Sequence, residues 1–175
     1  MLPLRKILCP TDFSEPSLHA LRHACELAAH FGAELHLMHV LPLTPPFPSD
    51  LLVVAVRVES DAERETRAAH LLQQIIKEHV PDEVQATYSV KMGYAANEIA
   101  AAAEEGNADM LVISTHGITG WRHLAFGSVA ETIVRLSHRP VLTIHATASH
   151  TTAQHSIAQS EQTATAQNHA SETTP

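Results

Sequence analysis

Residues 110–136 read MLVISTHGITGWRHLAFGSVAETIVRL, and this stretch sets the organisation of the whole chain. The apolar run at residues 110–113 predicts a buried strand, and residues 129–136 predict a helix. A glycine-containing loop joins the two, with Gly127 and Ser128 where the helix begins. The first turn of a helix has unpaired N–H groups and a partial positive charge, which suit a phosphate group. The stretch therefore predicts a strand, a phosphate-binding loop and a helix.

Two better known phosphate motifs are absent from this loop. No Lys follows Gly127 and Ser128, so it is not a Walker loop, and no GxGxxG sequence follows the strand. A tight turn that needs glycine only for its backbone conformation is the alternative interpretation. The loop residues by themselves leave both interpretations open.

The spacing of the small residues resembles a family signature. Ser114, two residues, Gly117, nine residues and then Gly127-Ser128 are similar to G-x-x-G-x9-G-[ST], the signature of the nucleotide-binding branch of the universal stress protein family. One position departs from it, because Ser114 stands where the family has its first glycine. Residues 140–144, PVLTI, resemble the family's last strand, and the resemblance covers roughly residues 3–145.

Composition indicates one domain followed by a polar tail. The 175 residues include 19 acidic and 11 basic side chains, a formal charge of -8, which argues against a nucleic-acid surface. Residues 146–175 contain almost no large apolar side chain, so we expect a disordered tail after a domain at residues 1–145. No apolar run approaches the ~18 residues of a membrane span, and no signal peptide is evident, so we expect a cytoplasmic protein.

Strands alternate with helices along the chain. Strands are expected at residues 5–9, 35–40, 83–90, 110–113 and 141–145, and helices at 15–31, 62–79, from about 93 to 106 and at 128–137. Residues 51–58 are ambiguous between a short strand, a buried cover and the first turns of a helix. This alternation predicts an α/β protein with a parallel sheet.

Two pairs of side chains, two cysteines and two histidines, could bind a metal or react, but the sequence favours a purely structural role for each pair. Cys9 and Cys25 form no CxxC pair, so we expect buried free thiols. His36 and His39 are three apart on a predicted strand and point to opposite faces, which disfavours a shared metal.

Two loops carry chemistry suited to a ligand, residues 10–12 after the first strand and the glycine loop after the fourth. In open parallel sheets, ligands bind outside the carboxyl ends of strands where the strand order reverses. If both loops serve one ligand, strands one and four are neighbours. The family resemblance implies that arrangement: an open five-stranded parallel sheet of order 3-2-1-4-5, with helices on both faces, of the adenine nucleotide alpha hydrolase-like type.

Asp12 has two interpretations at this stage. Its carboxylate either contacts ribose hydroxyls or a magnesium ion, or it bonds the backbone of the following turn. The resemblance favours the ligand, and it also places Val40 where the backbone of relatives meets adenine, a position that equally fits the core. The full set of residues assigned to the nucleotide is Pro10, Thr11, Asp12, Val40, Ile113, Ser114, Gly117, Gly127, Ser128 and Val129.

The resemblance implies a stress-response regulator that binds ATP with magnesium. His116 invites a role as general base, but neither a nucleophile nor a paired carboxylate accompanies it, so hydrolysis is expected to be slow or absent. Arg122 adds the only fixed positive charge near the predicted site. The alternatives are an interaction module that binds no nucleotide, and a slow ATPase.

The last predicted strand also suggests a partner. Val141, Leu142 and Ile144 make it apolar, and an exposed edge strand invites pairing with another copy. Relatives in the family dimerise through this strand, so we expect a homodimer.

Overall fold

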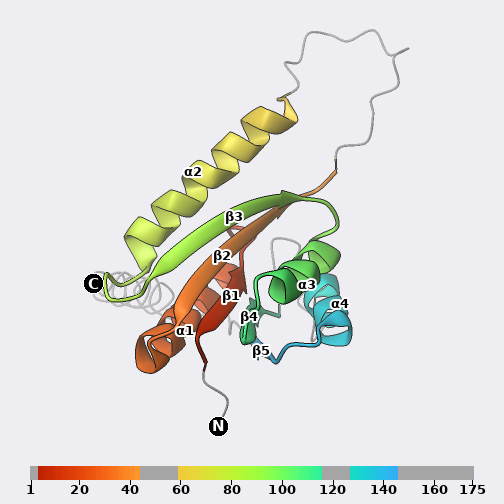
Figure 1. Ribbon diagram of the computed structural model, residues 1–175. Coiled ribbons are helices and arrows are strands. Elements are labelled where there is room, and N and C mark those ends of the chain that lie inside the picture. Colours follow the sequence, from red (N-terminus) through yellow and green to blue (C-terminus); the bar gives the residue numbers. More distant parts are fainter. Residues whose placement is uncertain (1–3, 44–58, 116–126, 146–175) are drawn as a thin grey trace, which may run out of the picture.

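The protein, here a computed structural model, folds around a five-stranded parallel sheet of order β3-β2-β1-β4-β5 (Figure 1). The structure describes residues 4–43, 59–115 and 127–145. The predicted fold class and strand order are confirmed. The elements in chain order are β1 (Lys6–Pro10), α1 (Glu15–Phe31), β2 (Glu34–Leu41), α2 (Asp61–His79), β3 (Ala86–Met92), α3 (Ala95–Glu105), β4 (Met110–Ser114), α4 (Ser128–Leu136) and β5 (Val141–Ile144).

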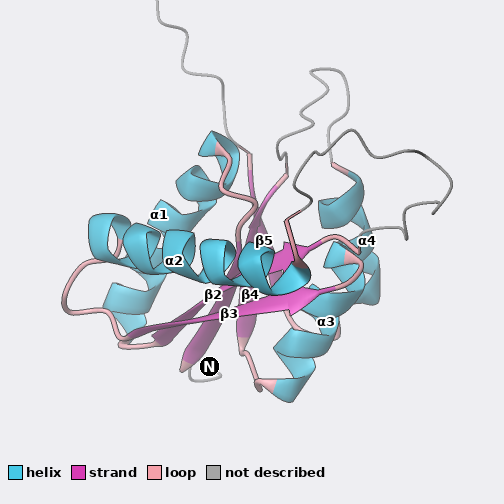
Figure 2. Ribbon diagram, turned by 90° about the horizontal axis from the view of Figure 1, so that it is seen from above, coloured by secondary structure: helices cyan, strands magenta, loops and turns pink. Residues whose placement is uncertain are grey.

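Helices cover both faces of the sheet, α1 and α2 on one side and α3 and α4 on the other (Figure 2). Alternate residues of the central strands supply each face, because successive side chains of a strand point in opposite directions. Ile7 and Leu37 pack against α1 and α2, whereas Leu8 and Met38 pack against α3 and α4. The two cores place β1 at the centre of the molecule.

Most expected boundaries lie within about one residue of the observed ones, but the third strand is an exception. Residues 83–90 were predicted, and β3 spans Ala86–Met92. The N–H of Val84 donates to the carbonyl of Pro81 over 3.0 Å, so the chain is still turning where the strand was expected. Val84 is nevertheless buried, and its apolar side chain made a turn resemble the start of a strand. The expectations for residues 51–58 and 146–175 lie outside the described residues.

Local chemistry sets the ends of α1 and α2. Ser14 caps α1 by accepting from the N–H of Ser17, and Gly32 ends this helix in the left-handed conformation at φ 62°. Ser60 and Glu63 form a reciprocal capping box at the start of α2. None of the described helices has the length and apolar character to cross a membrane.

Cys9 and Cys25 are buried free thiols, as predicted. Burial raises the pKa of Cys9 to about 12 and that of Cys25 to about 11. Both side chains therefore stay protonated at neutral pH and pack as small apolar groups in the core beside α1.

Candidate functional site

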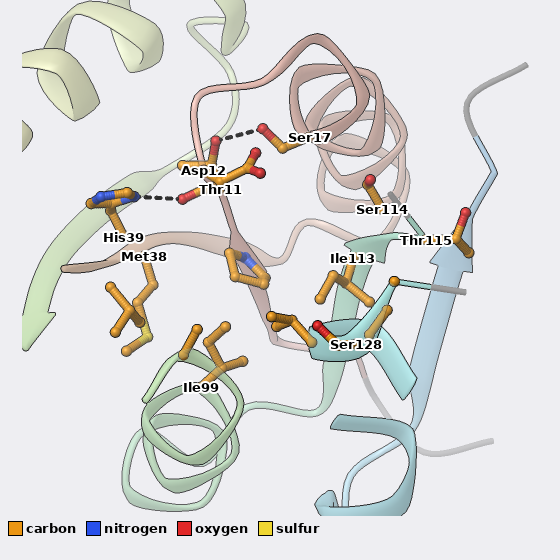
Figure 3. Close-up of a pocket in the computed structure, with 16 residues that line it drawn as sticks. Thr11, Asp12, Ser17, Met38, His39, Ile99, Ile113, Ser114, Thr115 and Ser128 are labelled. Carbon is orange, nitrogen blue, oxygen red and sulfur yellow. Dashed lines mark hydrogen bonds between the residues drawn. The ribbon is translucent and has the colours of Figure 1, made fainter. Parts of the chain in front are cut away.

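A pocket of about 210 Å³ opens at the carboxyl ends of β1, β2 and β4, where the sheet order reverses (Figure 3). It contains every residue assigned to the site from sequence except Gly117, which lies outside the described residues. The loop after β1 and the start of α4 thus meet, as the strand order requires. The lining residues are Pro10, Thr11, Asp12, Ser17, Met38, His39, Val40, Ala95, Ile99, Ile113, Ser114, Thr115, Gly127, Ser128, Val129 and Ala130.

Thr11 anchors the loop between β1 and α1. Its N–H donates to the carbonyl of Met38 over 2.8 Å, and its hydroxyl accepts from the N–H of Phe13 at 3.1 Å. The Ser17 hydroxyl donates to the carbonyl of Ser14, so the proton in the 2.9 Å bond between Thr11 Oγ1 and Ser17 Oγ comes from Thr11. The Thr11 hydroxyl and N–H are therefore both used to hold the loop in place.

Asp12 makes the turn that was one of its two interpretations. Its Oδ1 accepts from the N–H of Ser14 at 3.1 Å and also from the Ser14 hydroxyl. The carboxylate lines the pocket as well. No Lys or Arg is among the described lining residues, so the fixed charge that they bring to the pocket is negative.

His39 holds this loop from the side of β2. Its Nδ1–H donates to the carbonyl of Thr11 over 2.7 Å (Figure 3). The centroid of its ring lies 4.3 Å from that of the Phe13 ring. Phe13 has φ 66°, a left-handed conformation that costs a non-glycine residue of order 1–3 kcal/mol. From the sequence, the only role weighed for His39 was that of a metal ligand. His36 lies on the opposite face, as predicted, and no metal-binding group of three side chains occurs among residues 4–43, 59–115 and 127–145.

The start of α4 differs from the starts of α1 and α2, because Gly127 is its N-cap and supplies no capping side chain. Helix geometry leaves the N–H groups of Ser128, Val129 and Ala130 without an acceptor inside the helix. One expectation is corrected here: the N–H of Gly127 was expected to face a phosphate, but it donates to the carbonyl of Thr115 at 2.6 Å. The unpaired N–H groups at this helix terminus are therefore the three that follow Gly127.

The opposite part of the pocket is apolar. Met38 and Val40 project from β2, and Ala95 and Ile99 face them from α3. Val40 was predicted from the sequence to line the site, whereas Met38, Ala95 and Ile99 were not. Met38 was predictable from Val40, because residues two apart on a strand share a face. The pocket therefore joins an apolar slot to a polar end at α4.

The chain is a doubly wound α/β protein with a pocket at the switch point of its parallel sheet, where proteins of this class bind their ligands. The model of the universal stress protein family matches residues 3–145, and the chain belongs to this family. It is 32% identical over 152 residues to universal stress protein MJ0531 of Methanocaldococcus jannaschii, covering 80% of this chain and 81% of that protein. With universal stress protein MJ0577 of the same organism it shares 31% identity over 152 residues, or 80% and 94% of the two chains.

Solved structures share the fold at lower identity. A universal stress protein in complex with cAMP has a TM-score of 0.60 at 19% identity, with 83% of this chain and 100% of that chain covered. The universal stress protein from Archaeoglobus fulgidus in complex with dAMP has a TM-score of 0.58 at 21% identity, with 82% and 99% covered.

Proposed function

We propose that this chain is an ATP-binding universal stress protein that acts as a dimeric regulator in the cytoplasm. ATP binding would change its conformation or its choice of partner. The observation that carries the proposal is the pocket, which joins an apolar slot to an uncapped helix N-terminus. A nucleotide has the matching arrangement, with an apolar base at one end and phosphates at the other.

The pocket offers suitable surroundings for the adenine and for the phosphates of ATP. The adenine ring fits between Met38, Val40 and Ile99, which bury a flat apolar group. The phosphates meet the N–H groups at the start of α4, where the helix dipole favours negative charge. Two proteins of the same fold are solved with cAMP and dAMP, which supports an adenine nucleotide as the ligand class.

The charge of the pocket supports the proposal that magnesium accompanies ATP. ATP carries several negative charges, and the described lining offers a carboxylate, Asp12, and no Lys or Arg. Mg²⁺ is usually held by one or two carboxylates together with substrate phosphates, so Asp12 fits the role of its protein ligand. The ion would offset the repulsion between that carboxylate and the triphosphate.

Regulation through binding is favoured over turnover. Asp12 is the single carboxylate among the described lining residues, and its Oδ1 holds the turn at Ser14. A second carboxylate to orient an attacking water is absent from that part of the lining. We therefore place hydrolysis at a slow background rate.

The dimer is proposed to form through β5. This strand lies at the edge of the sheet, and Leu142 is 36% exposed. Pairing of two β5 strands would continue the sheet across two copies and cover its apolar edge.

Calorimetric titration of the full chain with ATP, ADP and AMP, each with and without Mg²⁺, tests the binding proposal. We expect ATP to bind and Mg²⁺ to tighten it. Absence of ATP binding at millimolar concentration would leave a family member that acts as an interaction module without nucleotide. If the protein released phosphate from ATP as fast as bound nucleotide dissociates, it would be an ATPase instead.

A further inference from the structure

A set of hydrogen-bonded polar side chains lies outside the pocket, on the face of the sheet across β2 and β3. The ring of His36 bridges the two strands, with Nδ1 at 2.8 Å from Thr87 Oγ1 and Nε2 at 2.9 Å from Ser89 Oγ. Thr87 Oγ1 in turn donates to Glu34 Oε1 at 2.9 Å, and Lys6 Nζ lies 3.8 Å from the same oxygen. Ser89, His36, Thr87 and Glu34 therefore form one continuous chain of hydrogen bonds.

The direction of the protons in this chain follows from the chemistry of each group. The single hydroxyl proton of Thr87 goes to the carboxylate of Glu34, so Thr87 accepts from His36 Nδ1–H. Burial and the charge of Lys6 lower the pKa of His36, against the opposite effect of Glu34. The ring is therefore neutral at pH 7, and its Nε2 accepts the hydroxyl proton of Ser89.

We propose that Ser89 is an activated nucleophile that accepts an acyl group from small activated acyl donors, such as aryl esters. A hydroxyl bonded to a neutral imidazole, which a third group holds in one tautomer, is the arrangement that activates serine. Thr87 and Glu34 form that third group here. This inference uses none of the residues of the nucleotide pocket and is independent of the proposed function.

The covalent step uses the atoms of this chain and the donor alone. Ser89 Oγ attacks the carbonyl carbon of the ester while His36 Nε2 takes the hydroxyl proton. The bond between that carbon and the leaving oxygen then breaks, and the leaving group departs with the electron pair. The products are an ester on Ser89 and a phenolate, and His36 returns its proton to water.

The position of Ser89 lets a small acyl donor reach it but favours a single acylation over repeated turnover. His36 and Ser89 are half-buried, and Thr87 is exposed, so a small donor can reach the hydroxyl from solvent. Backbone N–H groups of a sheet lie within its plane, so none points out of this face to stabilise an oxyanion. Formation of acyl-Ser89 expels a phenolate, whereas its hydrolysis must expel an alkoxide, a much poorer leaving group, so acyl-Ser89 is expected to accumulate at one group per chain.

The full chain treated with p-nitrophenyl acetate provides the test. Nitrophenolate release gives the rate, and peptide mass spectrometry locates the acetyl group. We expect acetylation of Ser89, its loss in Ser89→Ala, and a rate at least about 100-fold lower in His36→Gln. Thr87→Ser should keep the rate, and Thr87→Val should lower it. Ser137→Ala is the matched control, because the Ser137 hydroxyl bonds the carbonyl of Arg139 and contacts no imidazole in the described chain.

The site of the acetyl group on the unmodified protein decides the matter even if a variant fails to fold. Acetyl groups found only on lysines, or spread evenly over several serines, would overturn the proposal. An unchanged rate in folded His36→Gln would do the same, because the imidazole would then serve only to join β2 to β3.

Discussion

The backbone N–H of Gly127 donates to the carbonyl oxygen of Thr115 across 2.6 Å and so fixes the start of α4 against the end of β4. The same Thr115 donates its N–H to Ile144 at the end of β5 over 2.9 Å. One residue thus positions the helix N-terminus of the pocket and the last bond of the edge strand. The pocket and the proposed dimer edge share this support.

Gly127→Asp should weaken ATP binding without unfolding the protein. Gly127 has φ -70° and ψ 151°, which any residue adopts, and Asp at an N-cap accepts bonds from the first turn. The carboxylate would occupy the N–H groups that phosphates need and repel them. Loss of one charge-assisted contact costs about 1.5–3 kcal/mol, so affinity should fall more than about tenfold.

The matched control for that experiment is Gly127→Asn, which caps the helix without charge. It should weaken binding less than Gly127→Asp in the same calorimetric titration, and both melting temperatures should stay near that of the unmodified protein. Equal affinities for all three proteins would mean that the phosphates bind elsewhere.

Asp12→Asn should remove the magnesium dependence of ATP binding. The amide oxygen can still accept from the N–H of Ser14, so the turn persists, but the charge that holds the ion is gone. We expect the ATP affinities measured with and without Mg²⁺ to become equal. Loss of one charge-assisted contact corresponds to a change in affinity of about tenfold. Glu26→Gln, an exposed carboxylate on α1, is the control and should change neither value. A magnesium effect that survives in Asp12→Asn would assign the ion to other ligands.

Two proline substitutions on β5 should have different effects. The carbonyls of Pro140 and Ile144 accept from N–H groups on β4 and just after it, so both residues face β4. Alternate residues of a strand face the same neighbour, so the N–H of Leu142 also faces β4, whereas that of Thr143 faces the open edge. Thr143→Pro should therefore give folded monomers, and Leu142→Pro should lower stability because it removes a bond inside the sheet. Sedimentation velocity with thermal melts distinguishes them. A dimer that persists in Thr143→Pro would place the interface on another surface.

Alkaline pH should destabilise the protein through Cys9. The unfolded thiol ionises near its ordinary pKa of 9.0, whereas burial raises the folded value to about 12. A raised folded pKa gives stability that is complete below pH 9 and is lost as pH rises from 9 toward 12. The difference in unfolding free energy between the unmodified protein and Cys9→Ala should therefore shrink by about 1 kcal/mol from pH 9 to 10. Urea titrations at both pH values measure it, and a constant difference would mean that Cys9 ionises freely in the native state.

Local chemistry explains why parts of the fold were predictable. Ser14 and Gly32 mark the ends of α1 by capping and by a left-handed turn, and each effect acts within a few residues. The start of β3 was not predictable in this way. Val84 alternates with polar neighbours, and this pattern is the same whether the residue belongs to a strand or to the turn before it. The order of the strands came from the family resemblance, because periodicity does not specify which strands are neighbours.

The site residues likewise fall into those predictable from local sequence and those set by tertiary structure. Residues that belong to the two loops were named from the spacing of glycines and from Asp12, and all of those described line one pocket. The bond from His39 to Thr11 joins residues 28 apart, and the bond from Gly127 to Thr115 joins the start of α4 to the end of β4. Such partners are set by tertiary structure, so the sequence pattern assigned His39 no role and gave the N–H of Gly127 the wrong one.

The left-handed Phe13 has a kinetic consequence. With its ring against His39 and its N–H on Thr11, the loop before α1 has few alternative conformations. Its ordering entropy is lost when the chain folds and not when a ligand arrives. A ligand that meets this side of the pocket should therefore associate in one fast step, and its residence time should be set by how quickly its own contacts break.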